Sequence, residues 1–138
     1  ERAGSGIIYA GAGGVGIGYR KDLIGHGMMA EAIQVGPIIV DAGGKVGVTN
    51  TRHDRQNRSA VCLKPGVFVV VAVDGGLSLY PFAQLLAAPE SEGGLGCDVA
   101  INLDGGPSTQ ASGRAGGRHI DLLGGTTVQN ALLVSAKP

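Results

Sequence analysis

Glycine constrains this chain more than any other residue type. Of its 138 residues, 26 are glycine, nearly three times the usual share of about 7%. The glycines show no collagen-like period, and many form pairs between short apolar runs, as at Gly13-Gly14 and Gly116-Gly117. Because glycine readily adopts the backbone angles that tight turns require, the sequence predicts many short strands joined by tight turns.

The length and the charge balance exclude several classes of protein. A chain of 138 residues is enough for one domain and not for two, and 43% hydrophobic with 16% charged residues indicates a globular chain. Lys+Arg and Asp+Glu number 11 each, so the zero net charge argues against nucleic acid or an anionic membrane surface as a partner. No run of about 18 apolar residues is present, so no membrane span is predicted.

The two cysteines, Cys62 and Cys97, are too few for a zinc site on their own. Both lie beside apolar segments, so we expect them to be small buried hydrophobic side chains. A single disulfide between them is the alternative, and it would not by itself identify the compartment.

Apolar runs bounded by turn residues predict the strands. These runs are Gly6–Ala10, Val15–Tyr19, Pro37–Asp41, Ser59–Leu63, Val67–Val73, Val99–Leu103 and Val128–Val134, with a weaker one at Arg118–Leu123. One helix is predicted, with Ser78 as its N-cap and its end near Ala88-Pro89. The segment from Met28 to Gln34 is compatible with either a short helix or a strand.

The same turn sequence follows two of the predicted strands. Asp74-Gly75-Gly76 follows the strand Val67–Val73, and Asp104-Gly105-Gly106 follows the strand Val99–Leu103, with the predicted helix between them. Strand, helix and strand in this order form a crossover unit, and parallel neighbours would bring both turns to one edge of the sheet. The sequence therefore predicts a single α+β domain with a mixed β-sheet and one main helix in a strand-helix-strand crossover.

Asp104 has two interpretations. In a lone Asp-Gly-Gly turn, the aspartate often only caps the turn by accepting backbone N–H groups. In a binding site, Gly105 and Gly106 would let a ligand approach the backbone and would offer N–H groups to an anion, with Asp104 as general acid, general base or metal ligand. Asp74 would add a second carboxylate, and paired carboxylates are the usual machinery of glycoside hydrolysis. A divalent metal held by this pair is left open.

Arg58 is the candidate anion-binding residue. It stands immediately before the strand Ser59–Leu63, in the charged stretch Thr51–Ser59. A solvated loop is the plainer interpretation of that stretch. However, a guanidinium beside a strand is well held, and it can bind phosphate or carboxylate through two hydrogen bonds.

A weaker alternative is a nucleotide-binding protein. Gly11, Gly13 and Gly16 match the G-x-G-x-x-G fingerprint, which must open a helix. Here glycine alternates with apolar residues as far as Gly18, so we expect the return strand of a hairpin instead.

Several segments resemble the phosphodiester glycosidase domain family, in the family's order. The stretch "AINLDGGPST", Ala100 to Thr109, resembles the most specific signature of that family. The segments "AIQVGPIIVDAGG", "NRSAV", "VDGGLSLYPFAQLL" and "VQNALLV" are similar to further family segments. The resemblance runs from about Ala30 to Val134. It implies that residues 1–138 form one domain of this type that lacks the family's usual N-terminal portion.

The resemblance implies hydrolysis of a sugar-1-phosphodiester without a cofactor, in an extracytoplasmic location, with a second chain or an oligomer completing the domain. Asp104 and Asp74 would be the catalytic carboxylates. The residues that would bind the substrate are Arg58, Asn102, Gly105, Gly106, Ser108 and Thr109. The alternative from another class is a non-catalytic module that binds a glycan or wall polymer in the same pocket.

Overall fold

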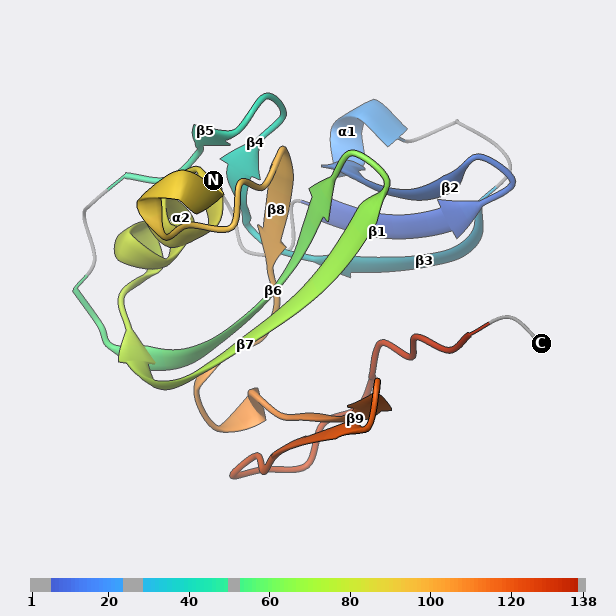
Figure 1. Ribbon diagram of the computed structural model, residues 1–138. Coiled ribbons are helices and arrows are strands. Elements are labelled where there is room, and N and C mark those ends of the chain that lie inside the picture. The colour runs from blue at the N-terminus through green and yellow to red at the C-terminus, as the bar shows by residue number, and fades with distance from the viewer. Residues whose placement is uncertain (1–5, 24–28, 50–52, 137–138) are drawn as a thin grey trace.

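The computed structural model describes residues 6–23, 29–49 and 53–136. These residues form three β-sheets and one main helix (Figure 1). Every strand pairing among them is antiparallel. Within the same ranges, no helix is long and apolar enough to cross a membrane.

The central sheet has five strands in the order β5-β4-β8-β6-β7. Their bounds are β4 Ile38–Asp41, β5 Lys45–Val46, β6 Gln56–Lys64, β7 Val67–Leu77 and β8 Val99–Asn102. The strands β6 and β7 form a hairpin around the predicted turn at Pro65-Gly66, and β8 pairs with the other side of β6. The long strand β6 is therefore hydrogen-bonded on both sides and carries the sheet.

The N-terminal sheet has the order β2-β1-β3. Its strands are β1 Gly6–Gly11, β2 Gly14–Tyr19 and β3 Met29–Val35, and the short helix α1, Arg20–Leu23, follows β2. The predicted hairpin at the glycine-rich start is confirmed, since β1 and β2 pair in register from Gly6 with Tyr19 to Gly11 with Gly14. A strand rather than a helix continues past Gly16, which removes the dinucleotide-binding alternative. The segment left open between helix and strand is β3.

Helix α2, Leu79–Ala87, covers one face of the central sheet (Figure 1). Ser78 occupies the predicted N-cap position, and the helix ends at Ala87 with Ala88 as its C-cap, close to the predicted end at Ala88-Pro89. Buried side chains of the helix, of the sheet and of the segment after the helix pack into one cluster. This cluster consists of Ile39, Val40, Ala60, Cys62, Phe82, Ala83, Leu86, Cys97 and Ala100. Because these side chains leave water together, they supply the main hydrophobic stabilisation of the domain.

A smaller cluster on the other face joins the central sheet to the N-terminal sheet. It contains Ile8 of β1, Ile38 of β4, Val61 of β6 and Ile101 of β8. Alternate residues of a strand point to opposite faces, so Val61 and Ile101 face the N-terminal sheet while Ala60 and Ala100 face α2. This alternation also places Asn102 on the same face as Ala100, toward the start of the helix.

The remaining strands form a hairpin that extends away from the core (Figure 1). The strands β9, Ala111–Ala115, and β10, Arg118–Leu122, turn at Gly116-Gly117. Most of their residues are exposed. The weakly predicted strand at Arg118 is confirmed as β10, whereas β9, with few apolar residues, was not predicted.

The expected α+β fold with a mixed sheet and a strand-helix-strand crossover is wrong. The chain is mostly β-sheet, and β7 and β8 are not neighbours, because β6 lies between them. The short Pro65-Gly66 turn forces β7 to pair with β6, which places β7 at the edge of the sheet. Helix α2 then returns the chain to the other side of β6, where β8 pairs.

The predicted closing strand Val128–Val134 is also wrong. This segment has no strand structure, and Leu133 is 91% exposed. An apolar run becomes a strand only where a neighbouring strand can pair with its backbone groups, and no described strand pairs with this segment.

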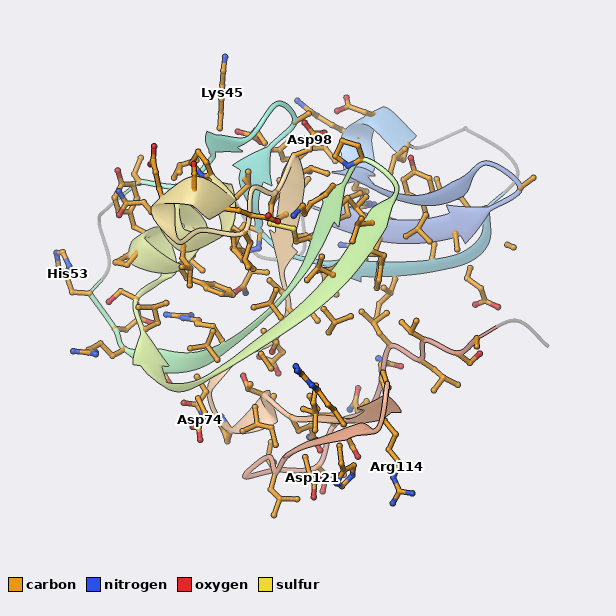
Figure 2. The ribbon with its side chains drawn as sticks, viewed as in Figure 1. Lys45, His53, Asp74, Asp98, Arg114 and Asp121 are labelled. Carbon is orange, nitrogen blue, oxygen red and sulfur yellow. A yellow bond between two sulfur atoms is a disulfide. The ribbon has the colours of Figure 1, made fainter. Side chains whose placement is uncertain are left out.

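Cys62 and Cys97 form a disulfide (yellow bond in Figure 2), so the expectation of two unbonded buried side chains is wrong. Both are almost completely buried, as predicted. Cys62 lies on β6, and Cys97 lies just before β8, so the disulfide links β6 to the segment that leads into β8, beneath α2. The apolar surroundings were visible in the sequence, but the pairing depends on the return path of the chain.

Removing the disulfide should lower the free energy of unfolding. Its two half-cystines are 35 residues apart, and closing a loop of that length stabilises a fold by about 3–4 kcal/mol. We expect a loss of this size in urea unfolding of the Cys62→Ala/Cys97→Ala variant. Wild-type protein under reducing conditions is the control, because it loses the crosslink but keeps both sulfur atoms. Equal unfolding midpoints with and without reductant would contradict the expectation.

Candidate functional site

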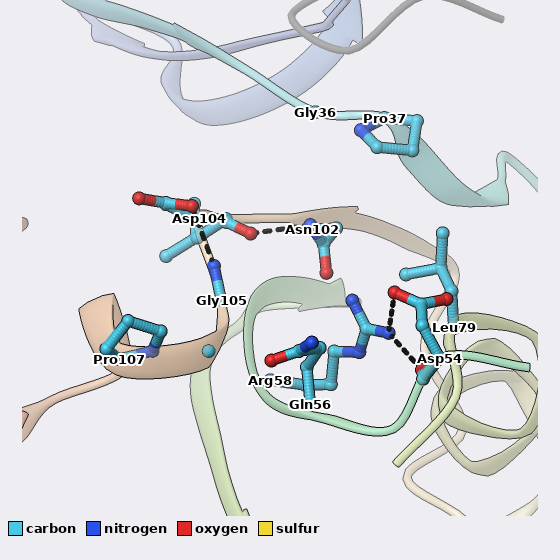
Figure 3. Close-up of a pocket in the computed structure, with 12 residues that line it drawn as sticks. Gly36, Pro37, Asp54, Gln56, Arg58, Leu79, Asn102, Asp104, Gly105 and Pro107 are labelled. Carbon is cyan, nitrogen blue, oxygen red and sulfur yellow. Dashed lines mark hydrogen bonds and ion pairs between the residues drawn. The ribbon is translucent and has the colours of Figure 1, made fainter. Parts of the chain in front are cut away.

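A cavity of about 440 Å³ lies where β6 begins and β8 ends (Figure 3). Three segments form most of its wall: the start of β6 with the residues before it, the end of β8 with the turn after it, and the approach to β4. The lining residues are Gly36, Pro37, Asp54, Gln56, Arg58, Leu79, Asn102, Leu103, Asp104, Gly105, Gly106 and Pro107. The cavity therefore brings together Arg58, Asn102, Asp104, Gly105 and Gly106 from the sequence prediction.

Arg58 is held rigidly and is only 8% exposed. Its Nε donates to the carbonyl of Leu77 at 2.7 Å, and its Nη2 donates to the carbonyl of Asp54 at 3.0 Å. Nη2 also lies 3.5 Å from the Asp54 carboxylate. A guanidinium has five N–H donors, and these contacts occupy those of Nε and Nη2. Among the described residues, the two N–H groups of Nη1 have no acceptor, so they are available to a ligand.

Asn102 is the last residue of β8 and is 9% exposed. Its amide nitrogen donates to the carbonyl of Leu103 at 2.5 Å. Its Oδ1 is buried and has no hydrogen-bond partner among the described residues. In Figure 3 this oxygen and the Arg58 guanidinium point toward one another. A buried acceptor without a donor is costly.

The Asp104 turn continues the line of β8 along β6. The N–H of Leu103 donates to the carbonyl of Ser59 at 2.8 Å, and the Ser59 hydroxyl donates to the carbonyl of Asp104, also at 2.8 Å. The chain then tightens into a 3₁₀ turn, Gly106–Ser108, which Figure 1 leaves unlabelled. Gly106 has a φ of 60°, a left-handed conformation that glycine adopts without strain.

The Asp104 carboxylate combines the two roles that the sequence left open. Its Oδ1 accepts the N–H of Gly105 at 3.0 Å, which is the capping role. The residue is nevertheless exposed and lines the cavity, so the carboxylate is accessible to a ligand there. Capping and accessibility are therefore compatible.

Asp74 does not line the cavity. Strand β7 continues through Asp74 to Leu77, so its Asp-Gly-Gly sequence is a bulge opposite Asn57 and not a turn after the strand. The Asn57 side chain holds this bulge, donating to the Asp74 carboxylate at 2.9 Å and accepting the N–H of Gly75 at 3.2 Å. Figure 2 shows Asp74 projecting outward below the sheet. The expected pairing of Asp74 and Asp104 in one pocket is not observed.

Two further candidates lie behind the turn and not in the cavity wall. Thr109 is 1% exposed, and its hydroxyl lies 3.3 Å from the hydroxyl of Ser59. Ser108 is half-buried, and neither residue lines the cavity. The buried Thr109 hydroxyl lies beside the Ser59 hydroxyl, which in turn holds the carbonyl of Asp104. Thr109 therefore supports the Asp104 turn from inside the fold.

Asp54 is the charged residue of the cavity wall that was not predicted from the sequence. Its side chain is 53% exposed, and it is the second carboxylate in the cavity wall. Asp54 lies in the charged stretch before β6, which was the one indication in the sequence. Its contact with Arg58 depends on the path of the folded chain and could not be predicted. Among the described residues, no group of three or more His, Cys, Asp or Glu side chains is placed to hold a metal ion.

The cavity thus combines a glycine turn, an exposed carboxylate and the Nη1 donors of Arg58, which have no acceptor in the part of the chain that the structure describes. Arginine donors suit an anionic ligand, and a carboxylate can move a proton, which together fit an acid–base hydrolase with an anionic substrate. The sequence model of the phosphodiester glycosidase family matches residues 4–135, so the chain belongs to that family. It is therefore a glycosidase-type hydrolase, as the resemblance implied. A comparison with curated proteins finds no match.

Gly105→Ala should destabilise the turn. A Cβ at this position would lie 2.8 Å from the backbone carbonyl oxygen of Asn57, which cannot move without shifting β6. We expect the free energy of unfolding to fall by about 1–3 kcal/mol in urea unfolding, as for other overpacked positions. Gly113→Ala in β9 is the control, because its Cβ would meet nothing within 4 Å. Equal stability of the two variants would show that the close contact is relieved without cost.

Proposed function

We propose that the chain hydrolyses the bond between the anomeric carbon of a sugar and a phosphodiester group. The observation that carries this proposal is the buried guanidinium of Arg58, held on two sides by Leu77 and Asp54, with two donors left for the cavity. A fixed guanidinium is well suited to a phosphodiester anion. Family membership supports the same chemistry.

In the proposed reaction, Arg58 binds the phosphodiester, and the glycine turn allows close approach to the backbone. Water attacks the anomeric carbon, and the bond from that carbon to the phosphate oxygen breaks with its electron pair remaining on the phosphate. Asp104 accepts the proton of the water and passes it to solvent. The products are the free sugar and a phosphomonoester. Because phosphate is a good leaving group, little acid assistance is needed at the departing oxygen.

Asp74 has no part in this proposal, because it lies outside the cavity wall. The second carboxylate at the cavity is Asp54, and its contact with Arg58 gives it an electrostatic role in anion binding. The disulfide supports an extracytoplasmic location, since disulfides persist in oxidising compartments.

Asp104→Asn tests the catalytic part of the proposal. The variant keeps the shape of the side chain but removes the proton acceptor, so we expect kcat to fall by about 10²- to 10⁴-fold. The measurement is the release of free sugar from sugar-1-phosphodiesters of both anomers, with substrate affinity measured alongside. Equal rates of release in wild type and variant would rule out the catalytic role of Asp104.

Asp54→Asn tests the anion site. The carbonyls of Leu77 and Asp54 still hold the guanidinium in this variant, while one partly exposed negative charge is lost. We expect a sugar-1-phosphodiester to bind about two- to five-fold more tightly, the range for one such charge, in calorimetric titrations. Asp121→Asn, on the distant hairpin strand β10, is the control. Weaker binding by Asp54→Asn would show that its carboxylate positions Arg58.

A non-catalytic module that binds a glycan or wall polymer is the second candidate function. The observation favouring it is that one of the two carboxylates at the cavity, Asp54, already contacts Arg58, whereas glycosidases usually employ two. This candidate predicts saturable binding of the phosphodiester with no release of sugar by the wild-type protein.

A further inference from the structure

We propose that Asn102 is a specificity-determining residue whose Oδ1 accepts a hydrogen bond from a sugar hydroxyl of the bound substrate. This inference rests on the proposed function and names the part of the substrate that the second half of the cavity recognises. Its starting point is the buried Oδ1 of Asn102, a residue of the cavity wall, which has no partner among the described residues.

The orientation of the Asn102 amide is fixed by its neighbour. Its nitrogen faces the carbonyl of Leu103 at 2.5 Å, and a carbonyl oxygen can only accept hydrogen bonds. Turning the amide over would place two acceptors against each other, so the oxygen must be the atom that points toward the Arg58 guanidinium (Figure 3). The wall of the cavity therefore contains an acceptor at Asn102 next to the donors of Arg58.

The Arg58 guanidinium and the Asn102 oxygen require opposite hydrogen-bonding groups in a ligand. The Nη1 donors of Arg58 require an acceptor, preferably an anion. The Oδ1 of Asn102 requires a donor, and the two groups point toward one another in Figure 3. A phosphodiester anion has acceptor oxygens and no O–H group, so it satisfies Arg58 and leaves Asn102 unpaired. A sugar hydroxyl beside the phosphate supplies the missing donor and can also accept from Arg58.

The cost of an unpaired buried acceptor makes this contact selective. A site built to bind a hydroxyl rejects an analogue without it, because the buried group is then left without a partner. The cavity is thus expected to prefer a sugar phosphodiester over a phosphodiester with two simple alkyl groups. Part of that preference depends on Asn102.

The test compares two probes by calorimetric titration of the whole chain. Methyl α-N-acetylglucosaminyl phosphate carries both the anion and sugar hydroxyls, whereas dimethyl phosphate carries only the anion. Asn102→Leu keeps the size of the side chain and removes the acceptor. We expect affinity for the sugar probe to fall about ten-fold or more in this variant, while affinity for dimethyl phosphate changes less than about two-fold.

Asn57→Leu is the matched control, since it makes the same change at the neighbouring strand end outside the cavity. It should leave the preference between the two probes unchanged. Equal weakening of both probes by Asn102→Leu would overturn the inference and leave Asn102 a structural role. An unchanged preference, or no binding of the sugar probe by wild type, would overturn it as well.

A second measurement does not depend on the folding of a variant. In wild-type protein, replacing the sugar hydroxyls one at a time by hydrogen should weaken binding about ten-fold at one position. Equal affinity across the deoxy series would mean that no sugar hydroxyl pairs with the Asn102 oxygen, which overturns the inference. Sugar selectivity that depends on Asn102 without turnover would sustain this inference and refute the hydrolytic function. Release of sugar by the wild type, with the same sugar selectivity in wild type and Asn102→Leu, would sustain the hydrolytic function and refute this inference.

Discussion

The hydrogen bonds between Ser59 and the two residues after β8 are the constraint on which the site depends. They continue the pairing of β6 and β8 beyond the last residue of β8, so that Leu103 and Asp104 still follow the path of β6. Arg58 is the residue next to Ser59, and the Asp104 turn therefore stays beside its guanidinium. A shift of register between β6 and β8 would turn every side chain of the shifted strand to the other face and would separate these groups.

The guanidinium of Arg58, which we propose as the anion-binding group, is supported by elements far apart in the sequence. The guanidinium of Arg58 bridges the end of β7, through Leu77, and the segment before β6, through Asp54. Because both acceptors are backbone carbonyls, the position of the guanidinium depends on the hairpin β6–β7 and little on neighbouring side chains. Preorganised donors of this kind need no rearrangement when a ligand arrives.

The sequence predicted the local features of this fold and missed those that depend on distant partners. The Pro65-Gly66 turn, the start of α2 after Ser78 and its end before Pro89 follow from the conformational limits of a few residues. The strand order does not, because the placement of β6 between β7 and β8 is set by non-local pairing. The segment Val128–Val134 illustrates the same limit, since its apolar pattern gives no information about whether a partner strand exists.

The residues of the candidate site also differ in whether the local sequence was enough to predict them. The Asp104 turn and Arg58 were found because each lies at the end of an apolar run. The two Asp-Gly-Gly segments have the same sequence. Nevertheless, Asn57 holds the one at Asp74 as a bulge, whereas the one at Asp104 follows the end of β8. Asp54 lies in the cavity wall only because of the path that the chain before β6 takes in the folded protein.

The disulfide between Cys62 and Cys97 has a consequence for chain cleavage. It spans the whole of α2 and the exposed turn Glu90–Glu92, which is an accessible place for a protease. A break of one peptide bond in that turn would leave two fragments that migrate together until a reductant is added. The strands that carry Arg58 and Asn102 would remain in one covalent molecule.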